Sequence, residues 1–258
     1  MSNDEVYCNV LYDLINTEDM IKPRDMLTKE ILGYHTKFDM AFPMLLNTRR
    51  KLNYKFMFGE AKWILTGSNT VNDISRHLHR ISQYSDNGYV FNGAYGPHFY
   101  RQRNYIVRTL VHDKDTRQAV LTIWQERPEA SKDIPCTVSL QWLIRDNDIN
   151  CIVNMRSSDV FLGLPYDLFN WGMMSLDIAA EYRKETGISL QPGNIYYNAG
   201  SCHLYLRDID KAIDASMYSF TPDEEHLMQT VPWGFIVRGE TTVMDYLDFK
   251  LERLYAEE

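Results

Sequence analysis

The stretch from Arg156 to Asp167 concentrates side chains that can bind an anion or exchange a proton. It holds one arginine, two serines, two aspartates, a glycine and a proline around a short apolar run. A strand pattern ends just before it, and a helical pattern is expected to begin after Asp167. Because loops held by rigid elements often carry binding and catalytic groups, we expect a ligand site at this junction.

Cys136 follows a proline at the start of a predicted strand and could act as a nucleophile. A free cysteine can equally be a small buried hydrophobe, so residue type alone leaves both interpretations open. Arginines nearby in space would favour the thiolate. The chain has no Walker pattern and no G-x-G-x-x-G loop. A phosphate group would therefore be bound by arginines and hydroxyls such as Arg156 and Ser157.

Glu60 lies within the apolar segment 56–65, where a carboxylate is costly to bury unless it is paired or protonated. The alternative is an exposed position at a helix edge.

His203 can be a core histidine or a proton relay. The basic run 49–51 can be a solvated loop or an anion-facing one. We reject His77 and His79 as a metal pair, because helical positions two apart point in different directions.

The elements that would position these groups follow from hydrophobic periodicity and turn residues. We expect a hairpin across the Asp146-Asn147-Asp148 turn, and a short helix with weaker strands before an acidic helical tail. Helices are predicted at 4–20, 56–65, 71–81 with Thr70 as the N-cap, 99–112 and 168–186, and strands at 26–40, 119–124, 137–144, 149–155, 195–197 and 202–205. The pattern predicts one α+β domain over residues 1–258.

Composition narrows the class of protein. The 258 residues are 45% hydrophobic, which suits a sizeable core, and the net charge of -8 argues against direct binding of a nucleic-acid polymer. The four cysteines form no Cys-x-x-Cys pair, so we expect neither a metal site nor a disulfide framework. No secretory pattern and no apolar run of 18 residues is present, so we expect a reducing cytoplasm and no membrane span.

The run 155–166, Met-Arg-Ser-Ser-Asp-Val-Phe-Leu-Gly-Leu-Pro-Tyr, closely resembles the signature of the thymidylate synthase family. Other segments also resemble family motifs: Pro135-Cys136 the nucleophile, Thr116-Arg117 the arginine turn, 59–67 the glutamate helix, and 94–96 and 200–205 further motifs. The resemblance implies a mixed β-sheet flanked by helices, with one sheet face forming a dimer interface.

One departure from the synthases concerns the base. Synthases carry asparagine after Leu-Pro-Phe, where it pairs with uracil, and this chain carries Asp167. A carboxylate can accept from an exocyclic amine, so the change resembles the phage deoxycytidylate hydroxymethylases. Thr137 after the cysteine, the segment 141–157 and the segment 198–201 resemble the same branch. Synthases also place a tryptophan between the glutamate helix and the Tyr-Gly motif, whereas residues 64–123 of this chain contain none. The resemblance implies that absence of this aromatic wall leaves more room for water.

The resemblance implies transfer of a one-carbon unit from 5,10-methylenetetrahydrofolate to carbon 5 of dCMP. Water capture would give 5-hydroxymethyl-dCMP and tetrahydrofolate, for the synthesis of modified DNA precursors, in the cytoplasm of an infected host if the protein is phage-encoded. The implied catalytic residues are Cys136, Glu60 and Asp167. The implied contacts are Arg24, Arg117, Arg156 and Ser157 for the phosphate, Asp167 for the base, His203 and Tyr205 for the deoxyribose, and Asp159, Gly163, Trp63 and Tyr95 for the folate.

Family members are homodimers whose partner chain lends two arginines to the phosphate. Arg117 matches the first of them, whereas the second position is Gln118. Alternatives are a dUMP-directed enzyme of the same fold, either a hydroxymethylase or a true synthase, and a CMP hydroxymethylase. A non-catalytic regulator that binds a nucleotide or RNA is a further alternative.

Overall fold

A computed structural model describes residues 1–125, 130–218 and 231–256 and contains a seven-stranded mixed sheet. The strand order is β1-β2-β7-β5-β4-β3, and β6 pairs with β7. β7 lies antiparallel to β2 and parallel to β5, which makes the sheet mixed. The strands are β1 (Met20–Ile21), β2 (Thr28–Asp39), β3 (Val120–Thr122), β4 (Thr137–Arg145), β5 (Asp148–Met155), β6 (Ser158–Asp159) and β7 (Gln191–Tyr205).

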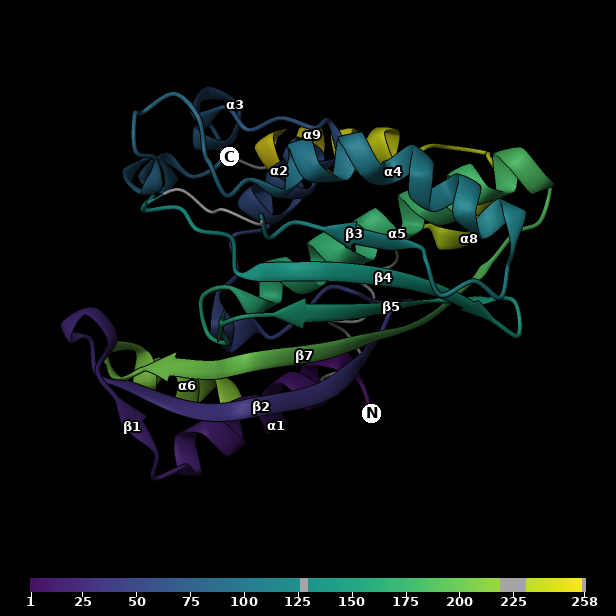
Figure 1. Ribbon diagram of the computed structural model, residues 1–258. Coiled ribbons are helices and arrows are strands. Elements are labelled where there is room, and N and C mark those ends of the chain that lie inside the picture. Colours follow the sequence, from purple (N-terminus) through teal and green to yellow (C-terminus); the bar gives the residue numbers. More distant parts are fainter. Residues whose placement is uncertain (126–129, 219–230, 257–258) are drawn as a thin grey trace.

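The helices gather behind the sheet and above its β3–β4 side in the view of Figure 1. The central helix α5 packs against β5 and β7, while α1 packs against α6 and β2. The helix α2 lies between α5, α4 and α9. The helices are α1 (Asn3–Asn16), α2 (Tyr54–Leu65), α3 (Val71–Ser75), α4 (Tyr95–His112), α5 (Leu164–Thr186), α6 (Ile209–Ser216), α8 (Trp233–Val237) and α9 (Val243–Ala256).

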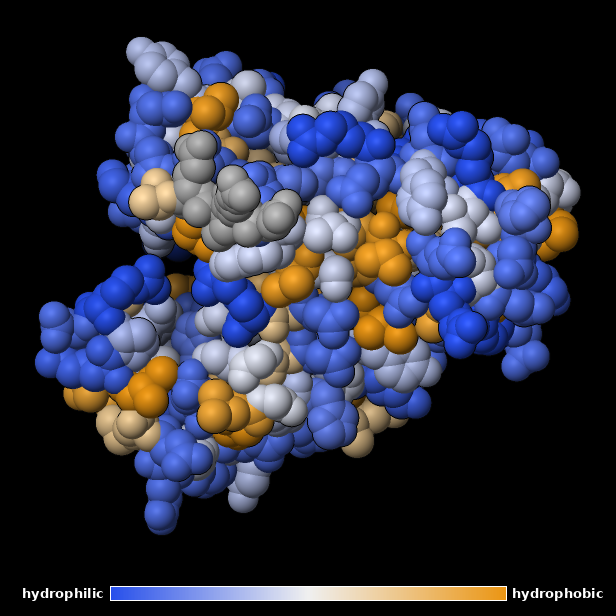
Figure 2. Space-filling model, viewed as in Figure 1, coloured by the Kyte–Doolittle hydropathy of each residue, from blue (hydrophilic) through white to orange (hydrophobic). Residues whose placement is uncertain are grey.

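The two sheet faces differ in burial. From Leu140 in β4 and from Ile149 in β5, every second residue, including Trp142 and Cys151, is buried beneath the helices. The opposite face is only partly covered by the described residues, and Leu32 there is 74% exposed and Tyr196 40% exposed. Figure 2 shows apolar patches among polar residues on the side of the molecule seen in Figure 1. The alternation follows from the two-residue period of a strand.

Local chemistry explains how the site elements begin. Asp146 and Asn147 adopt positive φ of 50° and 70° and form the tight turn that joins β4 to β5, which confirms the predicted hairpin. The Asp159 carboxylate accepts hydrogen bonds from the amides of Phe161 and Leu162 and so shapes the turn that leads into α5. At its other end α5 stops at Gly187, whose φ is 75°.

Several predicted helix boundaries are wrong. α5 begins at Leu164, so Asp167 lies in its first turn rather than before it; Pro165 fits there because its missing amide hydrogen would have no helical partner. α4 begins at Tyr95 rather than residue 99, and α1 ends at Asn16 rather than residue 20. Thr70 caps α3 as predicted, but that helix ends at Ser75, and a 3-10 helix (His79–Tyr84) follows it.

The segment 198–201 is not a loop between two strands, as its Asn-Ala-Gly-Ser composition suggested. It lies inside the 15-residue strand β7, where Asn198 pairs with His35 and Ser201 with Leu32 of β2. Pairing on both edges satisfies the backbone and outweighs weak local strand propensity. Downstream, α6 and α9 match the predicted short helix and helical tail. Part of the weaker strand prediction falls on residues 219–230, which lie outside the described residues.

The basic run 49–51 is neither a plain solvated loop nor a free anion site. Arg49 forms an ion pair with Asp214 at 2.8 Å. Arg50 donates from Nε to the Phe161 carbonyl at 2.7 Å and stacks on that ring. Arg50 therefore fixes the turn that carries Phe161. None of the helices in the described part of the chain combines the length and apolar character needed to cross a membrane.

Candidate active site

Cys136 immediately precedes β4 and lines a cavity of about 200 Å³. Its backbone is fixed by the Arg156 amide, which donates to the Cys136 carbonyl at 2.9 Å. The Arg156 guanidinium lies 3.7 Å from Sγ and also donates to the carbonyls of Pro135 and Ile134. Burial raises the pKa of the Cys136 thiol, and the positive charge of Arg156 opposes that rise. The free thiol is thus held protonated but next to a cation.

Glu60 faces the same cavity from α2, so the alternative of an exposed helix edge is wrong. Its Oε2 accepts a hydrogen bond from Nδ2 of Asn170 at 2.8 Å. Burial raises the pKa of Glu60 from 4.5 to about 7, and the Asn170 hydrogen bond opposes this rise. A carboxyl with a pKa near 7 can exchange a proton at neutral pH.

Asp167 lines the cavity from the first turn of α5. Burial is the main cause that raises the pKa of Asp167 well above its usual range, and repulsion from Glu60 adds to it. No hydrogen bond to its carboxyl group is found among the described residues. The buried Asp167 carboxyl is thus shifted toward its protonated form, and it lines the cavity where a ligand could contact it.

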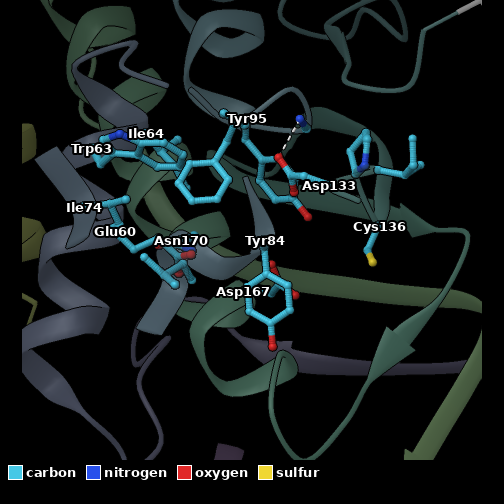
Figure 3. A pocket seen from close by; sticks show the side chains of 16 residues that line it. Glu60, Trp63, Ile64, Ile74, Tyr84, Tyr95, Asp133, Cys136, Asp167 and Asn170 are labelled. Atoms are coloured by element: carbon cyan, nitrogen blue, oxygen red, sulfur yellow. Dashed lines mark hydrogen bonds between the residues drawn. The ribbon is translucent and has the colours of Figure 1, made fainter. Parts of the chain in front are cut away.

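The cavity has a polar side and an apolar side. The polar residues lie at both ends of the cavity, and Figure 3 shows Cys136 at one end and Glu60 with Asn170 at the other. The apolar side brings together α2, α3, the 3-10 helix and the segment before α4, and is formed by Trp63, Ile64, Ile74, Ile81, Tyr84 and Phe91. Tyr95 closes the polar side, and its hydroxyl accepts from the Thr137 amide and hydroxyl at 3.3 and 3.0 Å. The space can hold a planar ring with carboxyls at its edge.

A second group of predicted residues meets at the end of β7. Ser157 Oγ lies 3.4 Å from Nδ1 of His203, and the His203 ring packs edge-on against Tyr205. Arg24, which has a positive φ of 50°, reaches the Tyr205 hydroxyl at 3.5 Å. His203 is 9% exposed, and burial lowers its pKa, so its imidazole is neutral at neutral pH. The group offers hydroxyls, a neutral imidazole and a cation.

The predicted folate residues divide between two places. Trp63 and Tyr95 lie in the cavity wall. Asp159 belongs to the turn before α5, and burial raises the pKa of its carboxyl. A Cβ on Gly163 would lie 3.2 Å from the Asp159 carbonyl oxygen and 3.5 Å from Asp167 Oδ2. A side chain at position 163 would therefore press on the Asp159 backbone and lie in contact with the Asp167 carboxyl.

Arg117 does not join the site of its own chain. It is exposed, and it precedes β3 near the Arg145 end of β4, where Arg145 donates to the Asp115 carbonyl. Cys136 lies before the opposite end of that nine-residue strand. At about 3.3 Å per residue the two are separated by roughly 25 Å, too far for an arginine side chain.

Sequence reasoning missed two polar residues of the cavity. Asn170 follows Asp167 by three positions on α5, and this helical spacing places both side chains on one face. That spacing was the available signal. Asp133 also lines the cavity and accepts from the Gly93 amide at 2.8 Å. No local pattern marks Asp133, because its loop is placed by Asp86, which accepts from the Lys132 amide.

A model of the thymidylate synthase family matches residues 5–224. The chain therefore belongs to this family, and the mixed sheet flanked by helices confirms the predicted α+β thymidylate synthase-like fold. Members use methylenetetrahydrofolate as a co-substrate, so the chain is a one-carbon transferase acting on a pyrimidine nucleotide. Within the described ranges, no group of three or more histidine, cysteine, aspartate or glutamate side chains could hold a metal ion.

Proposed function

We propose that this protein is a deoxycytidylate 5-hydroxymethyltransferase. It would transfer the one-carbon unit of 5,10-methylenetetrahydrofolate to carbon 5 of dCMP and capture water, giving 5-hydroxymethyl-dCMP and tetrahydrofolate. The single observation that supports dCMP is Asp167, a carboxyl at the edge of the cavity whose pKa burial raises well above its usual range, which favours its protonated form. Cytosine has a basic ring nitrogen at position 3 that can receive this proton, whereas that nitrogen in uracil already carries one.

The proposed chemistry begins at Cys136. Its thiolate adds to carbon 6 of the pyrimidine, and the electron pair moves toward nitrogen 3, where Asp167 donates a proton. Carbon 5 thereby becomes nucleophilic. Arg156 favours the thiolate in this step because its charge lowers the pKa of Cys136. Protonation of the ring makes addition easier, so the two residues act on the same bond change from opposite sides.

Glu60 is the proposed group for the later proton transfers. After carbon 5 has bonded to the one-carbon unit, the carbon-5 proton and tetrahydrofolate leave, which gives an exocyclic methylene. An activated water molecule adds to this methylene, and the Cys136 thiolate then leaves carbon 6, which restores the ring double bond. With a pKa near 7, Glu60 can accept and return a proton at neutral pH. The co-substrate supplies a carbon at the oxidation level of formaldehyde, so the hydroxymethyl product needs no oxidant or reductant.

The remaining contacts follow the two groups of residues described above. Arg156, Arg24 and Ser157 would bind the 5′-phosphate, for which arginine offers paired donors. His203 and Tyr205 would bind the deoxyribose hydroxyl. The flat apolar wall beside Trp63 fits the ring system of a folate, and Tyr95, Asp159 and Gly163 would border it.

A homodimer is part of the proposal. Arg117 is exposed and remote from the site of its own chain, so it is free to complete the phosphate site of a partner. The partly exposed sheet face around Leu32 and Tyr196 is the proposed interface. The proposed unit is the whole chain, residues 1–258, as one domain, acting on precursors of modified DNA in the cytoplasm, which is that of the infected host cell if the protein is phage-encoded.

The decisive experiment measures folate-dependent release of tritium from carbon 5 of dCMP, dUMP and CMP, with the product mass. Release from dCMP and a hydroxymethyl product are expected. Release from dUMP alone would refute the cytosine assignment, a methyl product would refute water capture, and preference for CMP would refute the deoxyribose assignment. Cys136→Ser should abolish release but still bind nucleotide, and full turnover by it would contradict covalent catalysis.

A further inference from the structure

Asn170 is a polar residue of the cavity, and only one of the two polar atoms of its side chain has a hydrogen-bond partner among the described residues. Its side chain is 2% exposed, and its Nδ2 donates to Glu60 at 2.8 Å. Its Oδ1 is buried and has no hydrogen-bond partner among the described residues. A buried acceptor without a donor destabilises the folded state, so fold stability does not explain this residue. Figure 3 shows Asn170 beside Glu60 at the wall of the cavity.

Glu60 and Asp167 are two carboxyls in one small cavity, and only one of them receives a hydrogen bond from Asn170. Two neighbouring buried carboxyls do not both ionise readily, because each negative charge raises the pKa of the other. A donor that reaches one carboxyl stabilises the negative charge on that carboxyl. Here the donor reaches Glu60, and none of the described residues donates to Asp167.

We propose that Asn170 is a positioning residue that assigns the single negative charge of this carboxyl pair to Glu60 and leaves the proton on Asp167. This inference rests on the proposed function, in which Asp167 donates a proton to the cytosine ring and Glu60 accepts one. Asn170 contacts no reacting atom in this scheme. It acts through Glu60, by holding the carboxylate in place and by setting which member of the pair is the acid.

Among the described residues, no charged side chain donates to Glu60. In the same part of the chain, the remaining titratable groups that face the cavity are Tyr95 from α4, Tyr84 from the 3-10 helix, and Asp133 and Cys136 from the segment before β4. On the far side of α2, His77 packs against Gly59, and Asp248 of α9 pairs with Lys62. Burial pushes Glu60 toward its neutral form, so the hydrogen bond from Asn170 is the local contact that favours the ion.

The test is a pH titration of the carboxyl groups in the ligand-free full-length protein. The titration is monitored by carbon-13 NMR of labelled aspartate and glutamate side chains. Glu60→Gln and Asp167→Asn assign the two signals. The test variants are Asn170→Leu, which has a similar shape but no donor, and Asn170→Ala in case the first does not fold. The matched control is Asn47→Ala, a buried asparagine that donates to the Ala215 carbonyl away from the cavity.

In both Asn170 variants the ratio of ionised to protonated Glu60 at a fixed pH should fall about tenfold, the size expected for a lost hydrogen bond to a charge. The Asp167 signal should move the opposite way, because a neutral Glu60 no longer repels it. The Asn47 control should lower the thermal midpoint and leave both signals in place. Unchanged Glu60 and Asp167 titrations in the Asn170 variants would overturn the inference.

Because no nucleotide or folate is present, this outcome is independent of the substrate. If the wild-type enzyme fails to act on dCMP while the Asn170 variants still shift both titrations, the proposed function fails and the charge assignment stands. If the enzyme acts on dCMP and the titrations do not shift, the charge assignment alone fails.

Discussion

Substitution of Asp167 by asparagine removes a titrating group and changes little else. The two side chains have nearly the same shape. Asparagine still offers one acceptor and one donor to the edge of a ring. It cannot release a proton to nitrogen 3 of cytosine, however, because an amide is a far weaker acid than a buried carboxyl.

The expected loss follows from that missing proton. A positioned acid typically accelerates a reaction by about 10² to 10⁴, so kcat for dCMP in Asp167→Asn should fall by that factor. This corresponds to about 3 to 5 kcal/mol of barrier. Activity on dUMP should not fall, since the oxygen at position 4 of uracil needs only a hydrogen-bond donor. The ratio of kcat/KM for dUMP over dCMP should therefore rise by at least about 10².

The assay is tritium release from carbon 5 of each nucleotide, with nucleotide binding measured separately. The matched control is Asp133→Asn, the same change in the same cavity. Asp133 accepts from the Gly93 amide, and the oxygen of an asparagine can do so as well, so this variant should stay within a few-fold of wild type. If Asp167→Asn kept its dCMP turnover within threefold of wild type, the role of Asp167 as a proton donor would be wrong.

Three further predictions follow from the same geometry. The pKa of Glu60 rises from 4.5 to about 7 on folding, so the native state loses stability as pH rises through this window. Urea denaturation of Glu60→Gln should therefore show a gain of up to about 3 kcal/mol in the free energy of unfolding at pH 8 and no gain near pH 4. An equal gain at both pH values would contradict a buried titrating carboxyl. Arg156→Gln should slow alkylation of Cys136 at neutral pH about three- to tenfold, because loss of the positive charge raises the pKa of the thiol further; an unchanged rate would show that Arg156 does not act on the sulfur. Mixing the inactive variants Arg117→Ala and Cys136→Ser should restore up to about a quarter of wild-type activity, since random pairing gives hybrid dimers with one intact site, and no recovery despite subunit exchange would exclude a shared site.

Much of the fold could be predicted from local sequence. The hairpin at Asp146-Asn147 and the end of α5 at Gly187 depend on backbone conformations that these residues favour, so sequence alone indicates them. β7 could not be predicted as one strand, because its central residues are held by pairing with β2 and β5. The early start of α5 was missed because Leu164 and Pro165 look like part of the preceding turn.

The sequence alone determined the family motifs, the types of the three central side chains and the departure at Asp167. Only the tertiary structure decided their chemical states. Burial raises the pKa of Glu60 and Asp167, and this cost depends on the walls that α2, α4 and α5 build around them. The contact from Asn170 to Glu60 likewise joins residues 110 positions apart in the chain. Desolvation and long-range contacts arise only when the chain packs, which is why the pattern of residues could indicate an acid and a base but could not say which carboxyl is which.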